Sequence, residues 1–260
     1  MNPREFAERV SRGVVLRRRL PRHFHRLPLY VSPEAGLRFW RNDMQKVDPL
    51  LFRMVEELVK PGSVVWDVGA NVGLFAFGAA ALAGVHGFVL AIEPDIWLAH
   101  LLVRSTSSLQ SKPVRAAAVS VLCAAASNQN GVTGLEIAER ARASNHLVNL
   151  NGSSQSGGRR YQQRTLTITL DTLLDHFPPP SVVKIDVETA EVGVIQGASR
   201  LLSTVRPVIW CEVAADNSEA ITRLLHDHEY ELYSAKTPPL ERTSVARAPW
   251  DTLALPLLGR

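Results

Sequence analysis

The chain has 260 residues, of which 46% are hydrophobic and 21% are charged. This composition is typical of a globular protein and excludes a disordered, collagen-like or coiled-coil chain. Residues 1–26 contain eight arginines and two acids, a local charge of +6, whereas the net charge of the remaining chain is about −2. Nucleic-acid enzymes usually carry their basic patch around the site, so we expect no nucleic-acid partner.

The arginine-rich start is predicted to be a basic extension over residues 1–28, followed by one domain over 29–260. Phe6, Val10 and Val14 recur every four residues with arginines between them, which favours a basic amphipathic helix. Such a helix either packs on its own domain or lies on an anionic membrane surface. Peripheral membrane contact through the extension is therefore one of two open alternatives.

Two further features indicate a cytoplasmic protein. Cys123 and Cys211 are too few for a disulfide framework, and both lie in apolar runs, so we expect reduced core residues. Residues 72–92 carry no formal charge and are long enough to span a bilayer. However, the turn at 84–87 contains two glycines and divides the run into a buried helix and a buried strand. We therefore predict no membrane span.

Along the rest of the chain, short apolar runs alternate with helical segments. Strands covered on both faces are predicted at 64–70, 88–93, 114–120, 182–187 and 208–213, and two further strands at 231–234 and 252–255. Helices are predicted at 72–83, 95–108, 189–203 and 217–229. This alternation predicts an α/β fold with a mostly parallel sheet and right-handed crossovers.

One stretch interrupts the alternation. Residues 124–164 are rich in Asn, Ser and Gly and form a polar insertion. Insertions of this length in compact domains are usually surface loops, lids or binding loops. Two interpretations remain open, a surface loop and a segment that covers the substrate.

The first chemical motif is the turn VVWDVGANVG over residues 64–73. Gly69 permits a close approach between the backbone and a ligand, and the following helix supplies free N–H groups. The turn lies at the carboxyl ends of parallel strands, where open α/β sheets bind ligands. Counted from Gly69, however, the dinucleotide fingerprint has Asn71 and Leu74 where it needs glycines. An NAD-type oxidoreductase is thus a disfavoured alternative.

The second motif is AIEPD, in which Glu93 ends the second predicted strand. An acid at this place accepts hydrogen bonds from two ribose hydroxyls. Pro94 ends the strand because it has no N–H to donate to the sheet. The alternative is that Glu93 only caps the next helix.

The third motif is VVKIDVETAE over residues 182–191. Asp186 and Glu188 lie at the end of a buried strand, where a charge is costly unless it is paired or used. Residues two apart on a strand share a face, so both carboxylates and Lys184 can address one cavity. They could instead form an ion-pair network, or hold Mg²⁺ together with Glu212. No cluster of histidines supports a metal, and we predict none.

In this order, DVGANVG, EPD, KIDVETAE and the CEV of residues 211–213 resemble the FkbM family of S-adenosylmethionine-dependent methyltransferases. The resemblance covers roughly residues 45–256. It implies a class I methyltransferase fold, a Rossmann-like and mostly parallel seven-stranded sheet whose last strand is antiparallel. Where that family has E-G-A-E, this chain has Thr189 in place of the glycine. A non-catalytic binding protein with the same fold is therefore a further alternative.

The resemblance also implies a cofactor, S-adenosylmethionine, and an acceptor hydroxyl on a sugar, glycolipid or secondary metabolite. The residues expected to hold the cofactor are Asp67, Gly69, Ala70, Asn71 and Gly73 at its amino-acid end, with Glu93 and Pro94 at its ribose. A protonated hydroxyl is a poor nucleophile, so a general base is needed. Asp186 is the first choice and Glu188 the second, with Lys184 tuning either one or binding the substrate.

Overall fold

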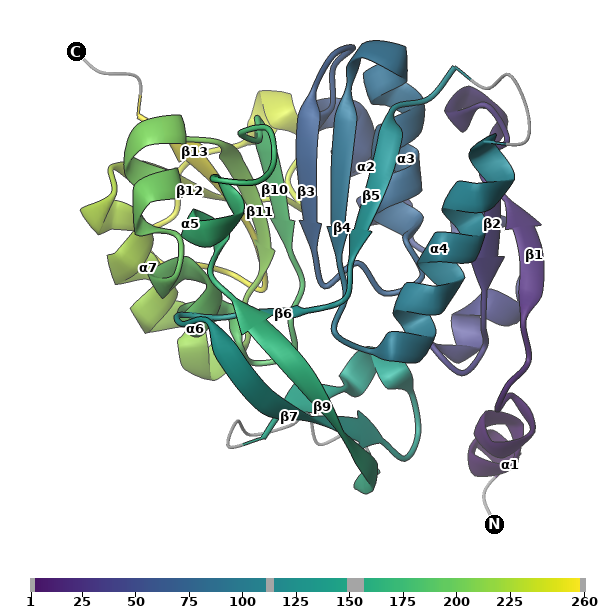
Figure 1. Ribbon diagram of the computed structural model, residues 1–260. Helices are drawn as coiled ribbons and strands as arrows, with labels where there is room; N and C mark the ends of the chain where they lie inside the picture. The colour runs from purple at the N-terminus through teal and green to yellow at the C-terminus, as the bar shows by residue number, and fades with distance from the viewer. Residues whose placement is uncertain (1–2, 111–114, 149–156, 258–260) are drawn as a thin grey trace.

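The computed structural model describes residues 3–110, 115–148 and 157–257. Its centre is a seven-stranded sheet in the order β12-β13-β11-β10-β3-β4-β5 (Figure 1). The strands are β3 (Val64–Val68), β4 (Phe88–Ile92), β5 (Ala118–Leu122), β10 (Val182–Ile185), β11 (Val208–Glu212), β12 (Tyr230–Ser234) and β13 (Asp251–Pro256). β13 is antiparallel to both of its neighbours, and the other adjacent pairs are parallel. The predicted class I methyltransferase fold is confirmed.

Helices cover both faces of this sheet. They are α2 (Pro49–Leu58), α3 (Leu74–Ala83) and α4 (Ile96–Gln110) on one face, and α5 (Leu170–Leu173), α6 (Glu191–Gln196) and α7 (Ser218–Asp227) on the other (Figure 1). Val65 packs into the core between the sheet and α2–α4, and its neighbour Trp66 packs into the core between the sheet and α5–α7. Both side chains are fully buried. Burial on both sides explains why the strands are continuous apolar runs.

The chain also contains short helical turns. They are η1 (Arg22–Phe24), η2 (Leu37–Trp40), η3 (Met44–Lys46), η4 (Gly84–His86), η5 (Arg142–Ser144), η8 (Ala215–Asn217), η9 (Pro239–Glu241) and the π-helical turn η7 (Leu201–Val205).

Two predicted elements differ from the structure by more than two residues, and the bounds of the others agree within two. The strand predicted over 114–120 is β5 and begins at Ala118, which pairs with Phe88 at the start of β4. Residue 114 lies outside the described ranges. The helix predicted over 189–203 is divided into α6 and η7. At the division, a Cβ on Gly197 would lie 2.1 Å from the carbonyl oxygen of Ser127. Glycine therefore lets the start of the insertion pass against this helix.

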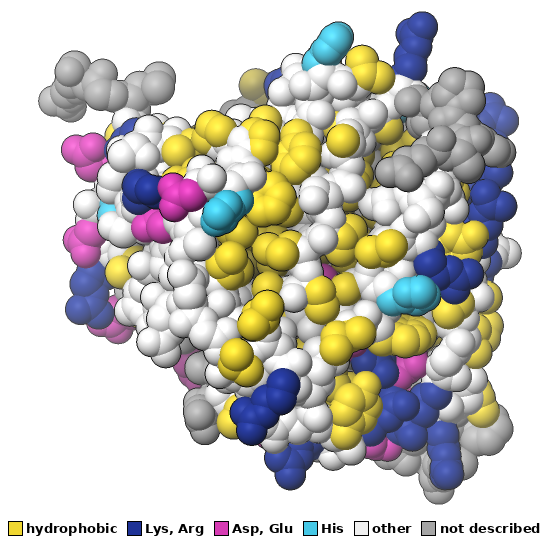
Figure 2. Space-filling view, viewed as in Figure 1, with side chains coloured by type: hydrophobic (Ala, Val, Ile, Leu, Met, Phe, Trp, Pro, Cys, Tyr) yellow, Lys and Arg dark blue, Asp and Glu magenta, His cyan; other side chains and the backbone are white. Residues whose placement is uncertain are grey.

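The N-terminal extension is not helical throughout. Helix α1 (Pro3–Val10) ends before Val14, and β1 (Leu16–Arg19) and β2 (Pro28–Val31) then form an antiparallel hairpin. Leu20, Phe24 and Leu27 of this segment are buried in the core, and beside it the amide of Tyr30 donates to Ser105 Oγ on α4 at 2.9 Å. The extension therefore contributes to the domain core. Lys and Arg side chains gather in Figure 2 along the edge where Figure 1 shows β1 and β2.

The polar insertion is a second sheet rather than an irregular loop. Its four strands, in the order β6-β9-β7-β8, are β6 (Ala125–Ala126), β7 (Gly131–Ala138), β8 (His146–Leu147) and β9 (Arg159–Ile168). In Figure 1, β7 and β9 extend past the carboxyl ends of the central strands. Residues 149–156 lie outside the described ranges. Half of the residues of β9 are exposed and only Thr165 is buried, so the sequence carried no continuous apolar strand signal there.

The expectation that both cysteines are buried is half right. Cys211 is buried, but Cys123 is exposed, because it directly follows the edge strand β5. Within the described ranges, no helix has both the length and the apolar character that crossing a bilayer requires. The uncharged run from 72 to 92 divides into α3, η4 and β4.

Candidate active site

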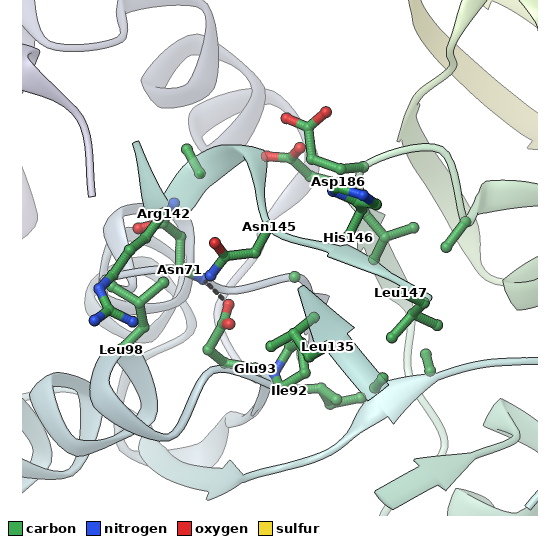
Figure 3. A pocket seen from close by; sticks show the side chains of 18 of the residues that line it. Asn71, Ile92, Glu93, Leu98, Leu135, Arg142, Asn145, His146, Leu147 and Asp186 are labelled. Atoms are coloured by element: carbon green, nitrogen blue, oxygen red, sulfur yellow. Dashed lines mark hydrogen bonds between the residues drawn. The ribbon is translucent and has the colours of Figure 1, made fainter. Parts of the chain in front are cut away.

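A cavity of about 180 Å³ opens at the carboxyl ends of the central strands and beneath the insertion (Figure 3). Ten residues of the three sequence motifs and the CEV segment line it: Gly69, Asn71, Ile92, Glu93, Pro94, Asp186, Val187, Glu188, Ala190 and Glu212. The insertion adds Leu135, Arg142, Asn145, His146 and Leu147. The structure thus brings the three motifs together and places the insertion over them.

The glycine-rich turn has a geometry that other residues adopt poorly. Gly69 has φ of +81°, and a Cβ at this position would lie 1.9 Å from the carbonyl oxygen of Asp186. Asn71 follows at φ of +52°, with its side-chain oxygen accepting from the amide of Val72 at 2.8 Å. Only glycine lets the turn after β3 lie against the end of β10. This contact fixes the position of the first motif relative to the third.

Three residues expected at the cofactor lie behind the cavity wall. Asp67 is fully buried and accepts from the amide of Ala76 at 3.0 Å, which ties β3 to the first turn of α3. Ala70 is also buried, and Gly73 precedes α3 at φ of +88°. These three residues support the turn, whereas Gly69 and Asn71 face the cavity.

Glu93 is a buried carboxyl group at the cavity, with 6% of its surface exposed. Its two oxygens accept from the amides of Asn71 at 2.7 Å and Asp95 at 2.9 Å. Burial is the largest cause that raises the pKa of Glu93 to about 8, and the charge of Asp95 adds to it. A carboxylate has about four acceptor sites, so each oxygen retains capacity for one further donor.

Lys184 lies beneath the cavity and holds Asp186. Its Nζ donates to Asp186 Oδ2 at 2.9 Å and lies 3.7 Å from Asp67 Oδ1. Burial acts to lower the pKa of Lys184, but the charges of Asp186 and Asp67 outweigh it and raise this pKa. Lys184 is therefore a permanent ammonium that orients Asp186, whose side chain is 37% exposed.

Two more carboxyl groups share the wall with Asp186. Burial, followed by the charge of Asp186, raises the pKa of both Glu188 and Glu212 to about 7. Trp250 Nε1 donates to Glu212 Oε2 at 3.2 Å. Among the described residues, no three His, Cys, Asp or Glu side chains are arranged to hold a metal ion. The wall can accept a proton near neutral pH.

Thr189 occupies a strained position. Its φ is +62°, in the left-handed region that β-branched residues avoid, and its buried Oγ1 has no hydrogen-bond partner. Its amide donates to Glu191 Oε1 at 3.1 Å, and its carbonyl accepts from Asn217 Nδ2 at 3.1 Å. These bonds hold the backbone in the conformation that a glycine would adopt without strain.

Thr189→Gly should therefore stabilise the folded protein by about 1 kcal/mol. Relief of the left-handed strain and loss of the unpartnered hydroxyl outweigh the greater entropy of an unfolded glycine. Urea denaturation of the two proteins measures the difference. Thr189→Ala removes the hydroxyl but keeps the strained backbone, so it should gain less than Thr189→Gly. A Thr189→Gly protein no more stable than the parent would show that the backbone carries no strain here.

A buried ion cluster fastens the insertion to the Glu93 side of the cavity, and we call it the Arg142 clasp. Arg142 contacts Glu34 Oε1 at 2.9 Å and Asp95 Oδ2 at 2.6 Å. Asn145 Nδ2 donates to the same oxygen of Asp95 at 2.8 Å, and Arg160 contacts Glu34 at 2.5 Å. The five side chains come from the N-terminal segment, the loop after β4 and the insertion. Sequence reasoning missed them because these partners lie far apart in the chain.

The comparisons with known proteins agree with this geometry. Residues 67–232 match the Methyltransferase FkbM domain family. The hexuronic acid methyltransferase AglP of Haloferax volcanii is 28% identical over 190 residues, which cover 72% of each chain.

Solved structures show similar folds. The methyltransferase FkbM of Methylobacillus flagellatus KT has a TM-score of 0.48 at 14% identity, over 78% of this chain and 49% of its own. The present chain thus spans about half the length of that protein. A precorrin-6Y C5,15-methyltransferase from Geobacter metallireducens GS-15 has a TM-score of 0.45 at 14% identity, over 81% and 86% of the two chains. The family match extends over more than half of the residues of the present chain. The chain therefore belongs to the FkbM family of S-adenosylmethionine-dependent methyltransferases.

Proposed function

We propose that the protein methylates a hydroxyl group of a sugar. The observation that carries this proposal is the wall of three carboxyl groups, Asp186, Glu188 and Glu212, in the same cavity as Glu93. A hydroxyl acceptor needs a group that takes its proton, and these carboxyls are placed to do so. The family match gives no support to the NAD-type oxidoreductase.

The residues of the cavity suit S-adenosylmethionine. Glu93 is a buried carboxyl with unused acceptor capacity, which matches a pair of ribose hydroxyls. Pro94 and Leu98 add apolar surface to the same side. Gly69 and Asn71 are placed to hold the amino-acid end of the cofactor, next to Asp186.

The bound cofactor supplies an electrophilic sulfonium methyl group, so the chain chiefly has to align the acceptor and remove a proton. In this proposal Asp186 accepts the proton of the acceptor hydroxyl. Lys184 holds the Asp186 carboxylate from below through its 2.9 Å hydrogen bond. Glu188 lines the same wall and is the second candidate for the base.

The acceptor we favour is a hexuronic acid, the substrate class in the name of the relative AglP. Arg38 and His146 place basic side chains in the cavity wall. Arg142 is already neutralised by two carboxylates, whereas Arg38 has one carboxylate, that of Asp48, at 3.1 Å. In this arrangement the sugar carboxylate faces Arg38 while a ring hydroxyl faces Asp186.

The test is methyl transfer from labelled S-adenosylmethionine to matched acceptors, a glucuronide and the corresponding glucoside. We expect labelled product from the glucuronide at a lower acceptor concentration than from the glucoside. The product should resist mild alkali, because an ether survives it and a methyl ester does not. An alkali-labile product would show that the carboxylate is methylated, and no transfer to either sugar would overturn the proposal.

Glu93→Ala should lower the affinity for S-adenosylhomocysteine on the order of 10- to 100-fold. It removes the hydrogen bonds to two ribose hydroxyls, each worth about 0.5–1.5 kcal/mol, which water replaces only in part. Turnover at saturating cofactor should change less, since this contact exists in both the ground state and the transition state. Isothermal titration and steady-state kinetics measure the two effects. Glu219→Ala, on the surface of α7, is the control, and an unchanged affinity in Glu93→Ala would contradict ribose binding.

A further inference from the structure

One edge of the molecule carries positive charge that the fold does not neutralise. It comprises exposed arginines of α1, the β1–β2 hairpin and the residue after η2: Arg9, Arg17, Arg19, Arg22, Arg26 and Arg41. We call these six side chains the basic edge, and Figure 2 shows Lys and Arg side chains along this side of the molecule. In the part of the chain that the structure describes, none of the six lies within ion-pair distance of a carboxylate.

Acids in the segments that border this edge are already engaged. Glu34 contacts Arg142 and Arg160, and Glu139 contacts Arg12. Exposed guanidinium groups side by side repel one another, and an external polyanion relieves that repulsion. The edge is therefore complementary to a negatively charged surface rather than to another part of this chain.

Two exposed apolar side chains lie among the arginines. Trp40 is 46% exposed and Val10 is 52% exposed. Trp40 Nε1 donates to Ser11 Oγ at 3.1 Å, which places the end of α1 beside η2. Arg18 Nη2 donates to the carbonyl of Trp40 at 3.2 Å, so the hairpin meets the same point. Tryptophan flanked by arginine is typical of surfaces that rest at the headgroup level of a bilayer.

Trp40 is close in sequence to a residue that lines the cavity. Arg38 lines the cavity, and Trp40 follows it two residues later in η2. Trp40 therefore shares its four-residue turn with a residue of the cavity wall. This relation distinguishes the basic edge from a charged surface remote from the site.

We propose that the basic edge, with Trp40 and Val10, docks the protein onto an anionic phospholipid membrane. The apolar pair favours a bilayer over a nucleic acid, whose phosphates would engage the arginines alone. Contact is through side chains of the hairpin, α1 and η2 rather than through one long amphipathic helix. Docking does not involve the methyl-transfer residues.

The experiment is flotation of the full chain with vesicles of phosphatidylcholine, with and without phosphatidylglycerol. We expect binding only to the anionic vesicles and release at high salt. The triple variant Arg9→Gln, Arg17→Gln, Arg22→Gln should bind on the order of 100-fold more weakly, because each arginine near an anionic surface contributes roughly fivefold. These three side chains take part in no hydrogen bond between described residues.

A matched control loses the same charge elsewhere. Lys60→Gln, Arg164→Gln, Arg223→Gln removes three exposed positive charges outside the basic edge and should float like the parent. Both triple variants should keep the parent's affinity for S-adenosylhomocysteine. Equal flotation of the two triple variants would overturn the proposal. Tighter binding to single-stranded RNA than to anionic vesicles at the same salt would also overturn it, in favour of a nucleic-acid partner.

Discussion

Asp186→Asn should lower turnover on the order of 10²- to 10⁴-fold while leaving the affinity for S-adenosylhomocysteine nearly unchanged. Asparagine keeps the shape of the side chain but cannot take a proton, and a general base is usually worth this factor. Lys184 keeps a carboxylate partner in the variant, since Asp67 Oδ1 lies 3.7 Å from its Nζ. The measurements are steady-state kinetics at saturating cofactor and isothermal titration.

The pH dependence separates the two candidate bases. The pKa of Glu188 is raised to about 7 by burial, so its carboxylate form increases as the pH rises through 7. If Glu188 were the base, kcat/KM would rise over that range, and Glu188→Gln would remove the rise together with most of the activity. Weakened cofactor binding with normal turnover in Asp186→Asn would contradict the role of Asp186 as the base and show that it binds the cofactor. Asp216→Asn, in the exposed turn η8, is the control.

Arg142→Ala should destabilise the folded protein by about 3 kcal/mol. The substitution leaves Asp95 buried without its guanidinium partner, and breaking a buried ion pair in this way is usually worth about 3–5 kcal/mol. Arg160 still contacts Glu34, which places the effect at the lower end. Urea denaturation measures the loss. Because the amide of Asp95 donates to Glu93, the affinity for S-adenosylhomocysteine should fall as well.

Two further variants show whether the effect of Arg142→Ala comes from its buried charge. Arg159→Ala removes an arginine of the same insertion that forms an exposed pair with Glu136, and should change stability by less than about 1 kcal/mol. Combining Arg142→Met with Asp95→Asn should recover part of the stability lost by Arg142→Met alone, since the unpaired carboxylate is gone. Equal losses for Arg142→Ala and Arg159→Ala would show that the Arg142 clasp contributes little.

The central sheet was predictable because its strands are buried on both faces. Runs such as Val64–Val68 and Val208–Glu212 are apolar on both faces, apart from Asp67 and Glu212 near their carboxyl ends, so their composition marks them directly. The hairpin and the insertion gave no such signal. In β1, three of four residues are arginines, and in β9 Arg159 to Gln163 are polar except for one tyrosine. Their strand pairing is set by tertiary contacts, which override local propensity.

The candidate site was predictable where a motif depends on local backbone geometry. Gly69 and Glu93 stand at the ends of adjacent strands, so spacing in the sequence translates into position in the cavity. Lys184 and Asp186 are two residues apart, and their contact follows from the strand itself. The Arg142 clasp had no such pattern, because Arg142 and its partners Glu34 and Asp95 meet only after the insertion has folded over the sheet.

The position of β13 has a consequence for truncated forms of the chain. β13 lies between β11 and β12, and β12 bonds to the central sheet only through it. A chain that stops between Ser234 and Asp251 would leave β12 without its neighbour and the edge of β11 open to pairing with another chain. Such truncated chains should therefore be more prone to aggregate than the full chain, and β13 is the strand whose presence closes the sheet.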